Sequence, residues 1–238
     1  MLDKIVKDYI DDFRTKTNDP ELKSYIVPNS IPIVWFGNLD NYMKSNRKIL
    51  TIGLNPSLNE FSEPRFQEIY FDDGVDSKKI ESLKQALDSY FDNNPYKRWF
   101  CRGERVLNDS FGASYYTEKA ESEGLNQAIH IDVYTAIATD PTWGNLDNNV
   151  RNKLRNTGLF NTLNPDIILV STNRTVFDEV FGDFTFEGER YQNPDRPSTL
   201  YVRKYRRGTQ VLFWVFNNRG MAFGPRFDFI ANSINDLE

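Results

Sequence analysis

One short apolar run, followed at once by a glycine and a turn, constrains the fold of this chain more than any other feature. Residues 49–52 read Ile-Leu-Thr-Ile, which is typical of a buried strand, and the chain then passes through Gly53 to the turn formers Asn55, Pro56 and Ser57. In an open α/β sheet, ligands bind beyond the carboxyl ends of the strands. We therefore expect the Asn55 amide, which can donate and accept hydrogen bonds, to lie at the mouth of a site. The same letters also suit an ordinary strand-to-turn transition.

Strand-type and helix-type patterns alternate along the rest of the chain. Strands are predicted over residues 31–36, 48–52, 128–134, 166–170, 184–186, 200–205 and 211–216, with a hairpin turn at 206–209 between the last two. Helices are predicted over residues 2–15, 77–91, 96–108, 148–163, 175–181 and 225–237, with Ser77 as a candidate N-cap. Residues 58–74 and 139–144 are predicted loops, and the first is too polar for the core. This order predicts a single domain, residues 1–238, of the α/β class: a three-layer α/β/α sandwich with a central, mainly parallel sheet.

The composition excludes several classes of protein. The chain of 238 residues is 39% hydrophobic and 26% charged, which is ordinary for a globular protein with one sizeable core. One cysteine, Cys101, and one histidine, His130, exclude an intrachain disulfide, a cysteine-rich zinc site and an iron–sulfur cluster. No stretch is long and apolar enough to span a bilayer, and the acidic N-terminal segment does not resemble a signal peptide. We expect a cytoplasmic monomer with no metal, no cofactor and no membrane partner.

The net charge of −5 argues mildly against a nucleic-acid partner, but a binding face responds to local charge. The basic residues form three groups: Arg203, Lys204, Arg206 and Arg207; Lys97, Arg98, Arg102 and Arg105; and Arg151, Lys153 and Arg155. Much of the acidity lies elsewhere in the sequence, so a basic groove on an acidic body is compatible with it. Each group taken alone is more typical of a solvated face.

The turn after the first apolar run resembles a known motif. Gly53-Leu54-Asn55-Pro56-Ser57 is similar to the first motif of the uracil-DNA glycosylase superfamily, which reads Gly-hydrophobic-Asn-Pro-Gly in the mismatch-specific and single-strand-selective branches. Further landmarks follow in the expected order. Asn94-Pro-Tyr-Lys-Arg-Trp-Phe100 is similar to a helix start of the mismatch-specific branch. Ile129-His-Ile-Asp-Val-Tyr134 and Asp140-Pro-Thr-Trp143 fit the base-reading strand and the loop that follows it.

The second motif of the superfamily is substituted here. The family ends its last parallel strand with His-Pro-Ser, or with Asn-Pro-Ser in the mismatch branch, whereas residues 211–216 run into Asn217-Asn218-Arg219-Gly220. By resemblance, Asn217, Asn218 and Arg219 would supply hydrogen-bond donors where negative charge develops on the departing base. An Asn-Asn pair is also a common turn. The resemblance covers most of the chain as a pattern, but only the first motif is close in its letters.

The resemblance also assigns roles around the first motif. Asn55 would position the attacking water. Glu60 or Glu63 would add a carboxylate that stabilises the sugar cation or accepts the proton of the water, although both also suit a surface loop. Candidate contacts to DNA are Ser57, Arg98, Arg203, Lys204 and Arg219.

The base-reading position carries an acid in place of the usual asparagine. An ionised Asp132 only accepts hydrogen bonds, which suits the exocyclic amino group of cytosine, whereas an unpaired carboxylate facing O4 of uracil would be costly. A shift of two residues would put His130 or Tyr134 there instead, and an ion-paired or capping Asp132 is the structural alternative. Candidates for stacking on the flipped base, with core packing as the alternative, are Phe66, Tyr70, Phe71 and Phe91.

These residues predict a monofunctional DNA glycosylase that flips out a base and hydrolyses its N-glycosidic bond. No lysine stands out as a Schiff-base nucleophile, so we expect an abasic site without strand cutting. An enzyme that removed normal cytosine would destroy the genome of its host. The expected substrate is therefore a modified cytosine, hydroxymethylated or glucosylated, in phage DNA, and the chain resembles bacterial anti-phage glycosylases in this respect. Three alternatives stay open: a uracil or mismatch glycosylase of repair, a non-catalytic nucleic-acid-binding protein on the same scaffold, and a hydrolase of small-molecule nucleosides.

Overall fold

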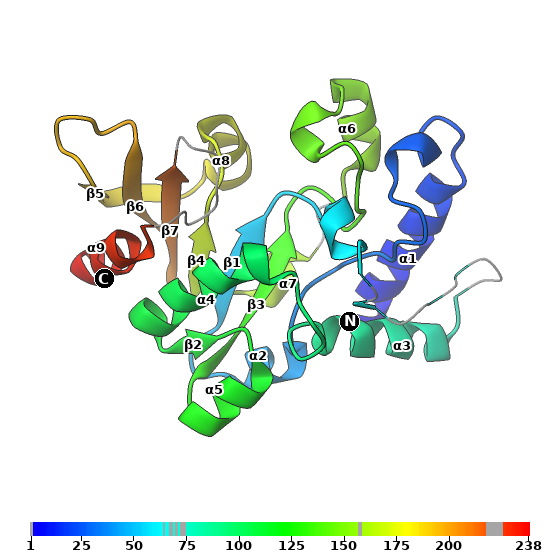
Figure 1. Ribbon diagram of the computed structural model, residues 1–238, viewed down its shortest axis with the longest axis horizontal. Helices are drawn as coiled ribbons and strands as arrows, with labels where there is room; N and C mark the ends of the chain where they lie inside the picture. The colour runs from blue at the N-terminus through cyan, green and yellow to red at the C-terminus, as the bar shows by residue number, and fades with distance from the viewer. Residues whose placement is uncertain are drawn as a thin grey trace.

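A mixed sheet forms the centre of the protein, in a computed structural model that describes residues 2–63, 65–66, 69, 71, 75–156, 159–217 and 226–238. Within these ranges seven strands pair in the order β2-β3-β1-β4-β7-β6-β5 (Figure 1). The strands from β2 to β7 in that order are parallel, and β6 and β5 extend one edge antiparallel. The strands are β1 (Ile49–Gly53), β2 (Ala113–Ser114), β3 (Asn126–Asp132), β4 (Ile167–Val170), β5 (Thr185–Tyr191), β6 (Leu200–Arg207) and β7 (Gln210–Asn217).

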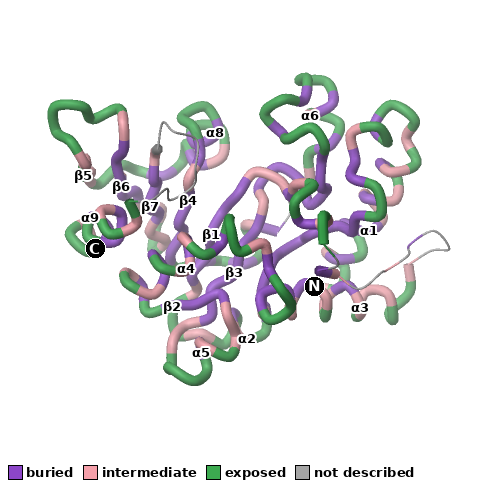
Figure 2. Tube along the Cα trace, viewed as in Figure 1, coloured by how far each residue is buried: buried purple, intermediate pink, exposed green. Residues whose placement is uncertain are grey.

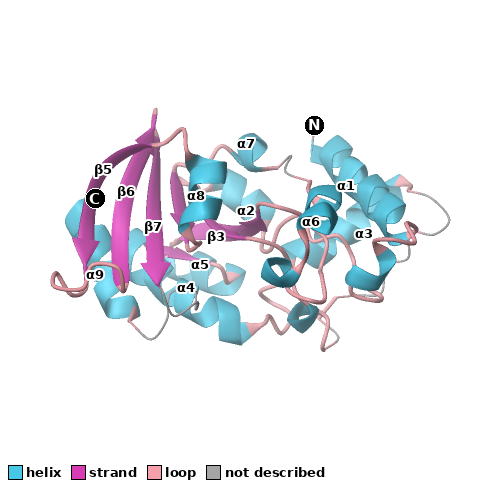
Figure 3. Cartoon of the chain, turned by 90° about the horizontal axis from the view of Figure 1, so that it is seen from above, coloured by secondary structure: helices cyan, strands magenta, loops and turns pink. Residues whose placement is uncertain are grey.

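Helices cover both faces of this sheet, which makes the three-layer α/β/α sandwich that the sequence predicts (Figure 3). One face carries α4 (Lys97–Phe111) and α9 (Phe227–Leu237), and the other carries α2 (Leu39–Lys44), α7 (Phe160–Leu163) and α8 (Arg174–Phe181). Two neighbouring residues of β7 show the two faces: Phe213 packs against Phe111 of α4, whereas Trp214 stacks on Phe177 of α8. The remaining helices are α1 (Leu2–Thr17), α3 (Ser77–Asp88), α5 (Thr117–Glu123) and α6 (Asn148–Leu154), with short 3-10 turns η1 (Lys23–Tyr25), η2 (Leu58–Glu60) and η3 (Trp143–Asn145).

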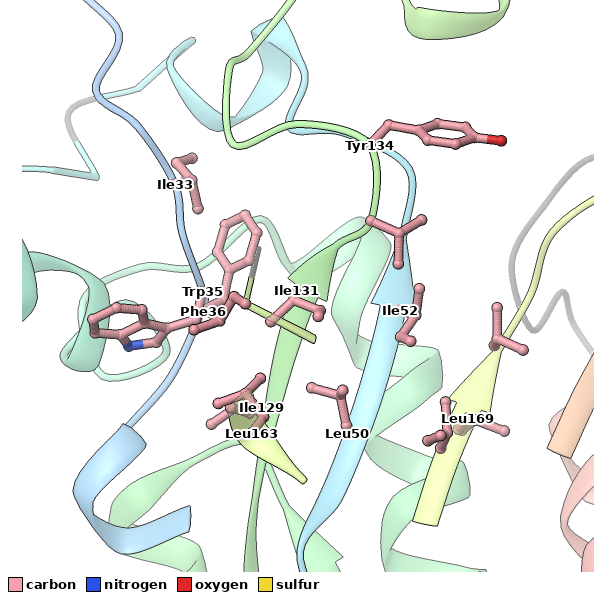
Figure 4. Packing of buried hydrophobic residues seen from close by; sticks show 14 of the residues in the cluster. Ile33, Trp35, Phe36, Leu50, Ile52, Ile129, Ile131, Tyr134, Leu163 and Leu169 are labelled. Atoms are coloured by element: carbon pink, nitrogen blue, oxygen red, sulfur yellow. The ribbon is translucent and has the colours of Figure 1, made fainter. Parts of the chain in front are cut away.

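The middle strands are buried on both sides (Figure 2). Every residue of β1 and β4 is buried, as expected for parallel strands between two helical layers. Leu50, Ile129 and Leu169 come from three neighbouring strands and belong to one connected cluster of buried side chains (Figure 4). That cluster extends from α1 to α9. Among the described residues, no helix combines the length and apolarity that crossing a bilayer requires.

The prediction of a strand over residues 31–36 was wrong. Phe36 alone forms a bridge, with His130, through two backbone hydrogen bonds of 2.8 and 3.0 Å. Residues 31–35 before it are buried, but the structure assigns them to no strand. Their apolar letters reflect side-chain packing: Ile33, Val34 and Trp35 all belong to the core.

The predicted helix 148–163 is two helices, α6 and α7, and residues 157–158 between them lie outside the described ranges. A tertiary contact explains where α6 ends. The ammonium group of Lys16 in α1 donates to the carbonyl oxygens of Leu154 and Arg155, at 2.9 and 3.1 Å. A cation that binds the last carbonyls of a helix satisfies them in place of further helical bonds.

Other boundaries differ by a few residues from the predictions. The loop 58–74 was predicted to be too polar for the core, yet Glu60, Arg65 and Phe71 in it are buried. The N-cap of α3 is Asp76, whose carboxylate accepts from the Lys79 N–H at 2.8 Å, and the side chain of Ser77 does not cap it. Elements that the sequence prediction missed are short: β2, α2 and α5.

Candidate active site

A cleft opens at the carboxyl ends of β1, β3 and β4. From β1 the chain first builds β2 and β3 on one side and then crosses to β4 on the other, so the cleft lies where the strand order reverses. Its volume is about 750 Å³. Each neighbouring strand contributes the residues that follow it, and the lining comprises Phe36, Gly53, Leu54, Asn55, Pro56, Ser57, Asn59, Glu60, Tyr96, Trp99, Phe100, His130, Asp132, Thr142, Trp143, Gly144, Ser171, Thr172, Asn173 and Phe216.

Asn55 lies at this cleft with the orientation of its amide fixed by two neighbours. Its Nδ2 donates to the carbonyl oxygen of Pro56 at 2.6 Å and to the hydroxyl of Thr139 at 2.9 Å. The Pro56 carbonyl can only accept, so the NH2 group must face it. Thr139 is itself held by a backbone bridge to Ser57. The Oδ1 of Asn55 accepts no hydrogen bond from the described residues, and it is therefore available to a water or a substrate.

Asp132 and His130 come from β3 and point to the same side of the sheet, because alternate residues of a strand share a face. Both side chains are almost fully buried, and His130 Nε2 lies 3.6 Å from Asp132 Oδ1. The register places Gly53 of β1 opposite Asp132. A Cβ atom on Gly53 would lie 2.3 Å from Asp132 Oδ1 and 2.9 Å from His130 Nε2. The glycine therefore makes room for the carboxylate at the cleft.

A buried row of hydrogen bonds holds His130 from behind. The Tyr115 hydroxyl donates to Thr51 Oγ1 at 2.7 Å, and Thr51 Oγ1 lies 2.9 Å from His130 Nδ1. The Thr51 hydroxyl can use its one proton toward His130 or toward the Ile129 carbonyl, which is more distant at 3.3 Å. Donation to Nδ1 leaves the imidazole proton on Nε2, on the side of Asp132. In that arrangement the Nε2–H of His130 lies beside the Asp132 carboxylate, whose Oδ1 is 3.6 Å from Nε2.

Glu60 brings a second carboxyl group to the cleft. It ends η2, is 5% exposed, and accepts a hydrogen bond from the Tyr90 hydroxyl. The pKa of Glu60 is raised to about 7, chiefly because burial disfavours its charged form. The hydrogen bond from Tyr90 and the charge of Arg65 lower this pKa, while the charge of Asp132 raises it. Glu63, the other predicted candidate, has a half-exposed side chain paired with Arg65 and does not line the cleft.

Most of the predicted stacking residues lie outside the cleft lining. Phe91 is buried and stacks on Tyr115 in the core, with ring centroids 4.6 Å apart. Phe71 is buried near Phe13. Phe66 stacks on Tyr90, with ring centroids 5.5 Å apart, and is not part of the cleft lining. Tyr70 lies outside the described residues.

The aromatic side chains that do line the cleft were not predicted to do so. Trp99 at the start of α4 is 41% exposed, which is unusual for so large an apolar side chain. Trp143 lies in the loop after β3, and Phe216 lies near the end of β7. Trp99 and Trp143 lie in segments 94–100 and 140–143, which resemble glycosylase motifs. This resemblance could have predicted that they line the cleft. Tyr134, an alternative base reader, instead stacks behind Trp143 and donates to Glu179 at 2.8 Å.

The predicted DNA contacts are divided. Ser57 lines the cleft, and Arg98 is exposed in α4 next to Trp99. Neither of the two predicted contacts in β6 lines the cleft: Arg203 pairs with Glu189 at 2.8 Å, and Lys204 donates to the Leu237 carbonyl at 2.7 Å.

The end of β7 is described only in part. Asn217 closes β7 with its backbone opposite Leu200, but its side chain is not described. Asn218 and Arg219 lie outside the described residues. In the part of the chain that is described, no three His, Cys, Asp or Glu side chains come together as a metal site would require.

No protein-family model, curated protein or solved structure matches this chain.

Proposed function

We propose that the protein is a monofunctional DNA glycosylase of the uracil-DNA glycosylase superfamily, which hydrolyses the N-glycosidic bond of a flipped nucleotide and leaves an abasic site. One observation carries this proposal: Asn55, Asp132 and Glu60, which come from separate segments, line a single cleft whose walls also include aromatic side chains, among them Trp99, Trp143 and Phe216. The enzyme would act on DNA as a cytoplasmic monomer, without a metal or cofactor.

The cleft supplies what hydrolysis of an N-glycosidic bond needs. Aromatic walls such as Trp99 and Trp143 can stack on an extruded base, because every base has a π face. The Oδ1 of Asn55 can accept a hydrogen bond from a water and hold that water for attack on the sugar carbon. Where positive charge develops early on the sugar, the water needs to be correctly oriented more than it needs to be activated as a nucleophile.

Asp132 favours a base with an exocyclic amino group. A carboxylate accepts a hydrogen bond from the amino group of cytosine, whereas it has no hydrogen to donate to O4 of uracil. A volume of about 750 Å³ lies within the range that proteins use for drug-sized ligands, and it leaves room for a substituent on a pyrimidine. We therefore assign a modified cytosine as the substrate, either hydroxymethylated or glucosylated as in phage DNA, with an antiviral role.

Substitution of Asn55 tests the proposal. Duplexes containing glucosylated hydroxymethylcytosine, cytosine or uracil at one position are incubated with the protein, and abasic sites are detected by alkaline cleavage. We expect cleavage of the modified-cytosine duplex by the parent protein and by Asn152→Ala, an exposed asparagine of α6 outside the cleft lining. Asn55→Ala should bind the same duplex but produce no abasic site.

Two outcomes would change the assignment. Abasic sites in the uracil duplex alone would make the protein a uracil or mismatch glycosylase. DNA binding by the parent protein without any abasic site would make it a non-catalytic binding protein.

A further inference from the structure

Glu60 is a buried carboxyl group that the proposed reaction has not yet used. A base of the cytosine type leaves the sugar reluctantly as an anion, and protonation of the base lets it depart as a neutral molecule. The cleft offers an acid for this purpose at Glu60, whose side chain lines it while being 5% exposed. Asp132, the other carboxyl group of the cleft, is reserved in the proposal for the exocyclic amino group of the base.

The hydrogen bonds behind Glu60 fix which of its oxygens can carry a proton. The backbone N–H of Tyr96 donates to the Tyr90 hydroxyl oxygen at 2.9 Å. The single hydroxyl proton of Tyr90 is therefore directed to Oε2 of Glu60. Burial and the neighbouring carboxylate raise the pKa of Tyr90 well above its usual range, so the phenol keeps that proton. Because Oε2 accepts from Tyr90, the acidic proton of Glu60 belongs on Oε1.

We propose that Glu60 is the general acid of the reaction, transferring its Oε1 proton to the departing base, and that its carboxylate then takes a proton from the attacking water. The inference rests on the glycosylase function proposed above. As the bond from the sugar carbon to the base nitrogen breaks, its electron pair goes to the base, which takes the proton from Glu60. Water held by Asn55 adds its oxygen to the sugar carbon, and its proton returns to Glu60. One water is consumed and the acid is regenerated.

The surroundings of Glu60 suit a group that must hold and release a proton near neutral pH. Its pKa is raised to about 7 by burial first, with Asp132 of β3 acting in the same direction. Tyr90 and Arg65 lower it. The other titratable residues of the described cleft wall are His130, whose Nε2 lies 3.6 Å from Asp132 Oδ1, and Tyr96.

The test is the pH dependence of base release under single-turnover conditions, with the substrate that the parent protein cleaves. The rate of the parent protein should fall as the pH rises through about 7, because the acid form of Glu60 is lost. Glu60→Gln should be slower at pH 6 by about 10²- to 10⁴-fold, and its rate should lack that decline. Glu63→Gln, in the same segment but outside the cleft lining, should behave as the parent protein does.

Two further measurements separate an acid from a structural residue. Tyr90→Phe removes a hydrogen bond that lowers the pKa of Glu60, so the decline should move to higher pH while DNA binding is retained. A fluorinated base, which departs more easily, should reduce the loss of rate caused by Glu60→Gln at least tenfold.

If the parent protein releases base but Glu60→Gln keeps its rate and its pH profile, the acid role is wrong and the glycosylase function stands. If the parent protein releases no base from any DNA, both proposals fall.

Discussion

The missing side chain of Gly53 is as important to the cleft as the side chains that line it. Gly53 has an ordinary backbone conformation, so its role is space alone: the Asp132 carboxylate occupies the volume that a Cβ atom would need. A methyl group there must push back Asp132 or His130, and His130 is held by Thr51. The position of the Asp132 carboxylate therefore depends on the absence of a side chain at Gly53.

We expect Gly53→Ala to destabilise the protein by ~1–3 kcal/mol, the usual cost of overpacking a tight site. The free energy of unfolding in urea measures this. The loss of stability caused by Gly53→Ala should be smaller in a protein that also carries Asp132→Ala, because the added methyl group then no longer meets the Asp132 carboxylate. Gly144→Ala is the control for stability, since a Cβ atom there meets nothing within 4 Å. Equal losses for Gly53→Ala and Gly144→Ala would contradict the packing argument.

Glu60 also makes a prediction about stability that needs no substrate. Its pKa is raised from 4.5 to about 7 in the folded protein, so the folded state binds this proton more tightly than the unfolded chain does. The resulting stabilisation is fully present below pH 4.5 and is lost as the pH rises to about 7. At ~1.4 kcal/mol per pKa unit the loss is ~3 kcal/mol.

Glu60→Gln stays neutral at every pH, so its free energy of unfolding relative to the parent protein should rise by ~3 kcal/mol between pH 4.5 and pH 8. Urea denaturation at a series of pH values measures the difference. Parallel profiles for the two proteins would show that Glu60 titrates in its ordinary range.

At the scale of elements, the sequence predicted best where one pattern was long or strongly apolar. The buried runs 49–52 and 211–216 form β1 and β7, and the amphipathic spacing of α1, α3, α4 and α9 is found with shifted ends. The strand predicted over residues 31–36 was wrong because burial and strand pairing are separate conditions. An apolar sequence indicates only burial. The break after α6 depends on Lys16, which lies far away in the sequence and could not be foreseen from local spacing.

Helix α3 allows a direct comparison of the cap that the sequence suggested with the cap that the structure contains. Asp76→Ala removes the carboxylate that accepts from the Lys79 N–H and should cost ~1 kcal/mol of stability. Ser77→Ala should cost less than ~0.5 kcal/mol, as for an exposed position without a capping bond. Denaturation midpoints of the two variants measure this, and a larger loss for Ser77→Ala would contradict the cap.

At the scale of the whole molecule, Asn55 and Asp132 line the same cleft because β1 and β3 are parallel neighbours, as the family resemblance implied and the strand pattern alone did not. The sequence did not predict which aromatic side chains line the cleft. The direction of Trp99 depends on how α4 lies against the sheet, and Phe91 looked equally suitable until its place in the core was known. Tertiary packing decides which aromatic residues reach a cleft, and local sequence carries little information about it.

The most direct test of the glycosylase function is mass spectrometry of the free bases released from whole DNAs that contain cytosine, hydroxymethylcytosine, glucosylated hydroxymethylcytosine or uracil. We expect a modified cytosine to be released by the parent protein, none by Asn55→Ala, and no base from unmodified DNA. Release of uracil alone would contradict the proposal that Asp132 selects a cytosine-type base. The absence of any free base would contradict the function proposed for this cleft.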